Sequence, residues 1–343
     1  MMRFSELGSR VARERIDMVQ LWNAWSETES LRRHSFLGSM NWETRNARHY
    51  LYRRRVGVAK SLGPRSVETE EIFAAFTEGK RANAERLRAL NEEIRVQASV
   101  LRALGAGRLP LMAARTLRAL QSHRTDSIRT VGTNALYAYE ALAGVTFSRD
   151  STATGDLDLL VDDRNRLQLV SEDGKRTGLG SLIQKKVDRT FRPRGPGDFR
   201  LINDQGYMVE FIRPQSRPMH RRMPGAEPLE KGDVEPAPIF GLQWLVNAPA
   251  VETMVLDERG FPVPMKAPDP RYWALHKSWL SNRLDRASLM RSRDRQQSEL
   301  VMRLVQEHLP HLPFDGEWMA GMPKELRRLV PEKGSDDSIE PPW

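Results

Sequence analysis

The 343-residue chain has no cysteine, and none of its seven histidines has the spacing of metal ligands. The missing cysteine excludes disulfide bonds, thiolate zinc sites and cysteine nucleophiles, and it fits a reducing cytoplasm, where we expect the protein. The chain also lacks any apolar run near the roughly 20 residues that a membrane-spanning helix needs, and it has no apolar signal segment. We therefore expect no membrane association.

Positive charge, by contrast, is abundant. Lys and Arg number 54 against 45 Asp and Glu, which gives a net charge of +9. This balance favours polyanionic partners through electrostatic steering and counterion release. Most of the cations are Arg, whose planar guanidinium group suits phosphate. A GC-rich genome that uses Arg in place of Lys would give the same composition, so charge alone leaves nucleic-acid binding open.

The hydrophobic pattern predicts an α+β fold in three regions. These are a helical N-terminal region (1–124), a core with a central mixed β-sheet and flanking helices (125–267), and a helical C-terminal cap (268–343) with a frayed tail after residue 332. Residues 215–238, rich in Pro, Arg and Gly, are expected to form a loop. Helices are expected over 11–30, 42–62, 67–104, 111–120, 133–143, 179–187 and 271–308, and strands over 127–131, 157–161, 199–202, 207–212, 251–256 and 261–265.

Three acidic residues in the predicted core are candidate metal ligands. Asp156 and Asp158 are two positions apart on an extended segment, so both side chains point to the same side. Such a pair suits Mg²⁺, although a solvated acidic turn has the same sequence. Glu210 lies in an apolar strand, where a charge is costly unless it is paired or binds a metal. Alternatively, Glu210 lies on a solvated face and pairs with Arg213 or Arg200.

A small-residue turn precedes the acidic pair. Gly132-Thr133 stands where a strand is expected to end and a helix to begin, which leaves backbone N–H groups free to bind an anion. The alternative is that Thr133 or Asn134 simply caps the helix.

This succession resembles the nucleotidyltransferase fold of the DNA polymerase β superfamily. The segment GTNALYAYEALAG, followed by T-x-D-x-D, is similar to the sequences of a largely uncharacterised branch of bacterial nucleotidyltransferase-like proteins. The resemblance implies that Asp156, Asp158 and Glu210 are catalytic and bind Mg²⁺ or Mn²⁺. This sequence differs from the superfamily pattern in two respects. The third acid is usually Asp, and the interval between the Gly-Thr turn and the acidic pair is longer here, so it must hold a helix and a loop.

The same resemblance implies a binding site for an NTP such as ATP. Gly132, Thr133 and Asn134 would hold the triphosphate, and Lys277 would neutralise it. Alternatively, Lys277 lies on a solvated helix face. The expected reaction moves a nucleoside monophosphate to a hydroxyl acceptor, which is an RNA end, a protein side chain or a small molecule. Two other functions remain open: a non-catalytic nucleotide-binding regulator of the same fold, and a basic nucleic-acid-binding protein.

Overall fold

The computed structural model describes residues 4–55, 57–121, 127–164, 177–195, 197–216, 233–320 and 322–330. The loop expected over 215–238 lies mostly outside this described part of the chain, and the tail expected after residue 332 lies wholly outside it. The boundaries after residues 124 and 267 stay predictions.

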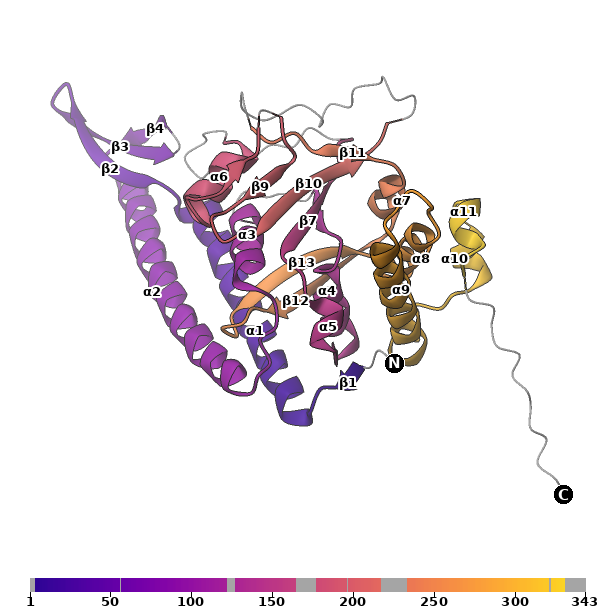
Figure 1. The fold of residues 1–343 in the computed structure, drawn as a ribbon. Coiled ribbons are helices and arrows are strands. Elements are labelled where there is room, and N and C mark those ends of the chain that lie inside the picture. Colours follow the sequence, from indigo (N-terminus) through magenta and orange to yellow (C-terminus); the bar gives the residue numbers. More distant parts are fainter. Residues whose placement is uncertain are drawn as a thin grey trace.

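A mixed β-sheet with flanking helices forms the centre of the molecule, which confirms the expected fold class (Figure 1). The strand order is β5-β7-β10-β9-β8, and β11 pairs with the end of β10. β10 runs parallel to β7 and β11, and the other neighbours are antiparallel. The strands are β5 (Ile128–Thr130), β7 (Asp156–Val161), β8 (Arg192–Pro193), β9 (Arg200–Ile202), β10 (Met208–Pro214) and β11 (Ala237–Ile239).

Both faces of the two middle strands are buried over most of their length. Leu157 and Leu159 of β7 pack in the largest apolar cluster, whereas Leu160 packs in a second cluster with Ile212 of β10. Helix α7 (Leu242–Asn247) supplies much of this second cluster. Because strand side chains alternate, the even-numbered positions of β7 and β10 face the α7 side of the sheet. This alternation determines the side on which the acidic residues lie.

Other elements cover the sheet. The strands expected over 251–256 and 261–265 are confirmed as the antiparallel pair β12 and β13. β1 pairs with β6, which lies in the interval between the Gly-Thr turn and β7. These elements are β1 (Phe4–Glu6), α3 (Leu111–Gln121), α4 (Ala135–Ala143), β6 (Val145–Phe147), α5 (Arg149–Thr152), α6 (Leu179–Lys186), β12 (Ala250–Leu256) and β13 (Pro262–Pro268).

The C-terminal region is helical, as expected. Asp269 accepts a hydrogen bond from the backbone N–H of Arg271 and so caps α8 (Pro270–Ser281), which has proline at its first position. α8 packs along α9 (Ser288–His308), and the short helices α10 (Gly316–Ala320) and α11 (Lys324–Arg327) follow. Among the described residues, no helix is long and apolar enough to cross a membrane.

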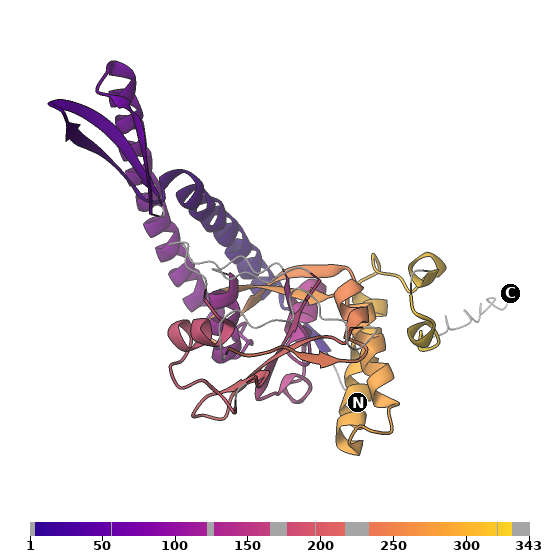
Figure 2. The same cartoon turned by 90° about the horizontal axis from the view of Figure 1, so that it is seen from above.

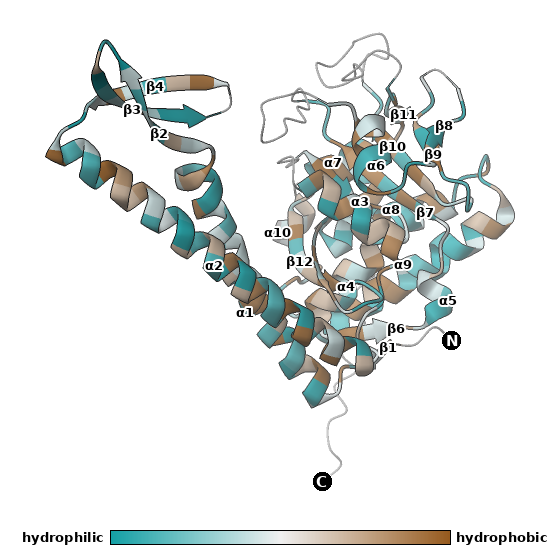
Figure 3. Ribbon diagram, turned by 90° about the vertical axis from the view of Figure 1, so that its left-hand side faces the viewer, coloured by the Kyte–Doolittle hydropathy of each residue, from teal (hydrophilic) through white to brown (hydrophobic). Residues whose placement is uncertain are grey.

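A long helical arm projects from the core (Figures 2 and 3). It consists of α1 (Ser9–Leu31), the π-helical segment η1 (Arg32–Phe36) and α2 (Val67–Ala103). A reciprocal pair of hydrogen bonds between Ser66 and Thr69 caps the start of α2. The far end of the arm carries a three-stranded antiparallel sheet of β2 (Ser39–Arg45), β3 (Arg48–Arg55) and β4 (Val58–Pro64).

This sheet shows that the helix expected over 42–62 is wrong. Asn46 and Ala47 both have positive φ, 48° and 59°, which suits a two-residue hairpin turn between β2 and β3. Gly57, with φ of 75°, lies between β3 and β4. Side chains between these turns alternate between the two faces of the sheet, and the run of arginines concealed this period of two.

Candidate active site

The three candidate acids lie on two adjacent strands of the central sheet. Asp156 and Asp158 are on β7, and Glu210 of β10 lies directly opposite Asp158 in the parallel register. All three side chains are half-buried, on the face of the sheet that α7 covers further along. Thr154 donates a hydrogen bond to the Asp156 carboxylate. The acids therefore lie near the start of β7, on the part of this face that α7 does not cover.

The alternative partners of Glu210 are engaged elsewhere. Arg213 binds Asp163 at 3.2 Å, and Arg200 contacts Asp198 at 3.5 Å. Glu210 forms no ion pair within the described part of the chain. Arg213 is therefore not its partner, whereas Arg200, directly opposite Glu210 on β9, lowers the pKa of Glu210 through its charge without forming an ion pair with it.

Gly132 lets the turn before α4 approach Asp158 closely. Its φ is +59°, and a Cβ added at this position would overlap the Asp158 carboxylate and lie 2.7 Å from its Cγ. The Gly132 carbonyl accepts a hydrogen bond from Trp273 Nε1 of α8 at 3.2 Å, and the backbone N–H of Val131 donates to the Asp158 carbonyl at 3.0 Å. The absence of a side chain is what permits this contact between turn and acid.

The side chains of Thr133 and Asn134 tie the turn to its surroundings. Asn134 is fully buried, and its Nδ2 donates to the Asp156 carbonyl at 2.6 Å. Thr133 Oγ1 accepts hydrogen bonds from Gln297 Nε2 and Arg293 Nη2 of α9, at 3.3 and 3.4 Å. Asn134, at the N-cap of α4, makes no side-chain capping bond, so the capping interpretation is wrong for it. Its Oδ1 has no partner among the described residues.

Charges of both signs meet at Asp158. Burial, and then the negative charges of Asp156 and Glu210, raise the pKa of Asp158 to about 7, while Lys277 and Arg286 oppose the rise. Burial and the charge of Asp156 also raise the pKa of Glu210. Like charges disfavour ionisation of a neighbour, so these directions show that the three acids act on one another electrostatically.

The donor set fits a hard divalent cation. Carboxylate oxygens suit Mg²⁺, which usually takes one or two protein carboxylates together with waters and substrate phosphates. Within the described ranges, no three His, Cys, Asp or Glu side chains form a ready-made metal cage. Asp156 and Asp158 would therefore hold the ion jointly with a bound phosphate.

Lys277 of α8 is buried, so a solvated helix face is the wrong interpretation. Its Nζ binds Asp294 of α9 at 2.8 Å and lies 5.3 Å from the centre of the Trp273 ring. Arg286 also binds Asp294. The ion pair holds Lys277 in place, and the charge of Lys277 lowers the pKa of Asp158.

Helix α9 also contributes to the site, through residues that the sequence pattern did not assign to it. Gln297 is fully buried and also donates to the Ser151 carbonyl at 3.1 Å, and Arg293 binds the Ala153 carbonyl. These contacts join the segment before β7 to the turn. A signal was present: Asp294 and Gln297 continue the helical stripe that includes Val301 and Leu304 of the core, which is unusual for solvated polar residues.

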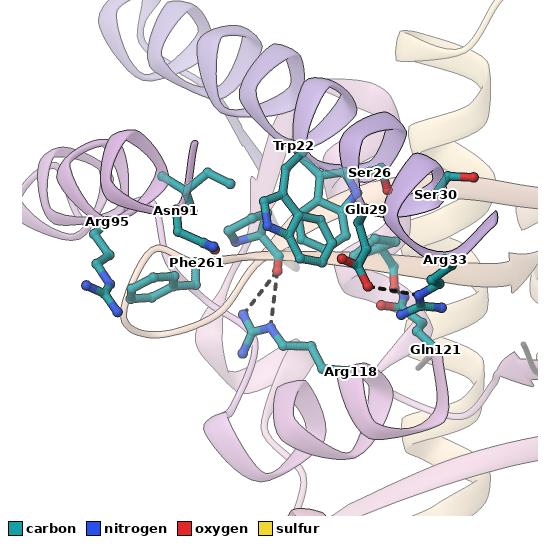
Figure 4. Close-up of a pocket in the computed structure, with 14 residues that line it drawn as sticks. Trp22, Ser26, Glu29, Ser30, Arg33, Asn91, Arg95, Arg118, Gln121 and Phe261 are labelled. Carbon is teal, nitrogen blue, oxygen red and sulfur yellow. Dashed lines mark hydrogen bonds and ion pairs between the residues drawn. The ribbon is translucent and has the colours of Figure 1, made fainter. Parts of the chain in front are cut away.

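A separate cleft of about 780 Å³ lies between the arm and the core (Figure 4). Trp22 and Trp25 of α1 stack at 4.9 Å in its wall, and Arg118 of α3 donates to the Pro262 carbonyl of β13 across it. None of the acids described above lines this cleft.

One comparison with known proteins gives a match. A family model described as nucleotidyltransferase matches residues 112–323. No curated protein and no solved structure matches the chain. The matched range includes the turn before α4, the three acids and Lys277.

Proposed function

Because the chain belongs to the nucleotidyltransferase family, we propose that it is an Mg²⁺-dependent enzyme that moves a nucleoside monophosphate from an NTP to a hydroxyl acceptor. The observation that carries the proposal is the register of β7 and β10, in which Glu210 lies opposite Asp158, the acid that contacts the turn at Gly132. Acids and an anion-binding turn at one place suit a metal-bound triphosphate.

In the proposed reaction, the acceptor oxygen attacks the α-phosphorus, the α–β phosphoanhydride bond breaks, and pyrophosphate leaves. Asp156 and Asp158 would hold Mg²⁺, which would stabilise the charge on the attacking and leaving oxygens. Glu210 would accept the proton of the attacking hydroxyl. The backbone N–H groups of the turn at Gly132, Thr133 and Asn134 would bind phosphate oxygens. Lys277 would add positive charge behind the triphosphate.

One observation favours a second candidate, a nucleotide-binding regulator without turnover. The third acid is Glu where the superfamily usually has Asp. A longer side chain in this position can retain the nucleotide while failing to align the acceptor.

The test is incubation of the full chain with each α-labelled NTP, Mg²⁺ and three acceptor sets: RNA, protein and small hydroxyl compounds. We expect label transfer and pyrophosphate release that fall at least about 100-fold in Asp156→Asn plus Asp158→Asn, the scale of losing a key electrostatic contact. Glu252→Gln, on the exposed edge of β12, is the matched acid control and should retain activity. Transfer that survives the double substitution would refute the metal assignment. Tight NTP binding with no transfer in any set would favour the regulator.

A further inference from the structure

The net positive charge of the chain is concentrated at the tip of the arm. Residues 32–66 contain nine of the 54 Lys and Arg residues but one of the 45 Asp and Glu residues. The segment therefore carries +8, and the rest of the chain, with 45 cations and 44 acids, carries +1. Figures 2 and 3 show that this segment, with β2, β3 and β4, lies at the end of the arm and away from the central sheet.

One face of the tip sheet is used for folding. Trp42 of β2 packs against Phe73 of α2, with ring centres 5.9 Å apart, and Leu51 is fully buried. Arg53 lies over the ring of Phe76, and it also donates to the carbonyls of Ser35, Leu37 and Ser39. Arg53 therefore holds this side of the sheet to the helices and is not available to a partner.

The opposite face has a different composition. Register pairs Asn41 with Tyr52, Glu43 with Tyr50, and Arg45 with Arg48. Residues directly opposite one another on neighbouring strands share a face. The two tyrosines, separated by one residue of the central strand β3, therefore point away from α2. We call this surface the tyrosine face. Its members on β2 and β3 are Ser39, Asn41, Glu43, Arg45, Arg48, Tyr50, Tyr52 and Arg54.

The tyrosine face combines aromatic rings with exposed cations. Tyr50 and Tyr52 are half-buried, and the guanidinium group of Arg45 lies 4.8 Å from the centre of the Tyr52 ring. Arg48 is exposed and forms no ion pair within the described ranges. The single acid, Glu43, binds Arg54 and Arg45, but exposed pairs of this kind contribute only about 0–1 kcal/mol and separate readily.

We propose that the tyrosine face binds single-stranded nucleic acid, with bases stacked on Tyr50 and Tyr52 and phosphates bound by Arg45 and Arg48. Aromatic rings on an open sheet are suited to unpaired bases, and a cationic border tracks the backbone. A lipid surface fits less well, because the described part of this face has no large aliphatic side chain to enter a bilayer. The proposal does not depend on the proposed transferase activity.

The test measures binding of the full chain to a fluorescent 20-nucleotide RNA, and to DNA of the same sequence, over a range of salt concentrations without NTP. Arg45→Gln plus Arg48→Gln should lower the salt slope by about 1.4, and affinity by about 25-fold at 0.1 M salt, because each single-strand phosphate contact contributes about 0.7 to the slope. Arg86→Gln plus Arg88→Gln, which removes two exposed charges from α2 below the tip, is the matched control and should bind as the wild type does.

The stacking contribution is tested separately. Tyr50→Leu plus Tyr52→Leu should weaken binding at least about 30-fold without changing the salt slope, since two stacked bases are lost and each is worth about 1–3 kcal/mol. Tyr50→Phe plus Tyr52→Phe retains the rings and should retain the affinity, which also controls for folding of the sheet. If the protein binds RNA and DNA with similar affinity, it recognises the bases and phosphates alone. If it binds RNA more tightly, it also contacts the 2′-hydroxyl groups.

Three results would overturn the proposal. These are equal losses in the α2 control pair, wild-type affinity in the leucine variant, or binding to phosphatidylserine vesicles but not to either oligonucleotide. Asp156→Asn plus Asp158→Asn should bind the oligonucleotide like the wild type. Failure of the transferase proposal would therefore leave this result unchanged.

Discussion

Gly132→Ala offers a direct test of how the turn before α4 supports Asp158. An alanine at φ +59° adopts the left-handed region, which costs roughly 1–2 kcal/mol. Its Cβ would also overlap the Asp158 carboxylate, so the acid must leave its rotamer, and overpacking of this kind adds about 1–3 kcal/mol. We expect a total loss of about 2–5 kcal/mol in urea unfolding and a weakened affinity for Mg²⁺ with NTP.

The chain provides a matched control for the backbone contribution. Gly144 at the end of α4 has φ of +67°, and a Cβ there would meet nothing within 4 Å. Gly144→Ala should therefore cost only about 1–2 kcal/mol and leave nucleotide affinity intact. In the background of Asp158→Ala, which removes the clashing carboxylate and leaves only the Cβ of residue 158 at 3.1 Å, Gly132→Ala should cost close to what Gly144→Ala costs. The reasoning is refuted if Gly132→Ala and Gly144→Ala destabilise the wild-type chain equally, or if Asp158→Ala gives no relief.

Two further substitutions test the buried charges behind the site. Burial lowers the pKa of His276 to about 3, whereas an unfolded imidazole titrates near about 6.5, so the unfolded chain binds more protons in between. Wild-type stability should fall by about 2 kcal/mol more than that of His276→Gln between about pH 7.5 and pH 5; parallel urea-unfolding profiles would contradict this. Lys277→Met removes one of the two cations on Asp294 and should cost about 1–3 kcal/mol in urea unfolding, with a loss below about 0.5 kcal/mol contradicting a structural ion pair.

The sequence determined much of the central sheet because its signals are local. Alternating or continuous apolar runs predict β7 and β10, and the strand expected over 199–202 is β9, which pairs with β10. The helix expected over 67–104 is equally readable and is confirmed as α2. The arm tip is the exception. The side chains of its arginine-rich strands alternate between the two faces of the sheet. Both faces carry arginine, so the period of two is not visible in the sequence, and the packing of Trp42 on α2 identifies the inner face.

Sequence alone also determined that Asp156 and Asp158 share one side of a strand, since the period of two is a property of the backbone. It could not decide what surrounds them. The burial of Lys277, its ion pair with Asp294 and the hold of Gln297 on Thr133 all arise where α8 and α9 pack against the turn before α4. A polar side chain of a helix becomes buried only where another element packs against it. The tertiary fold decides which element that is.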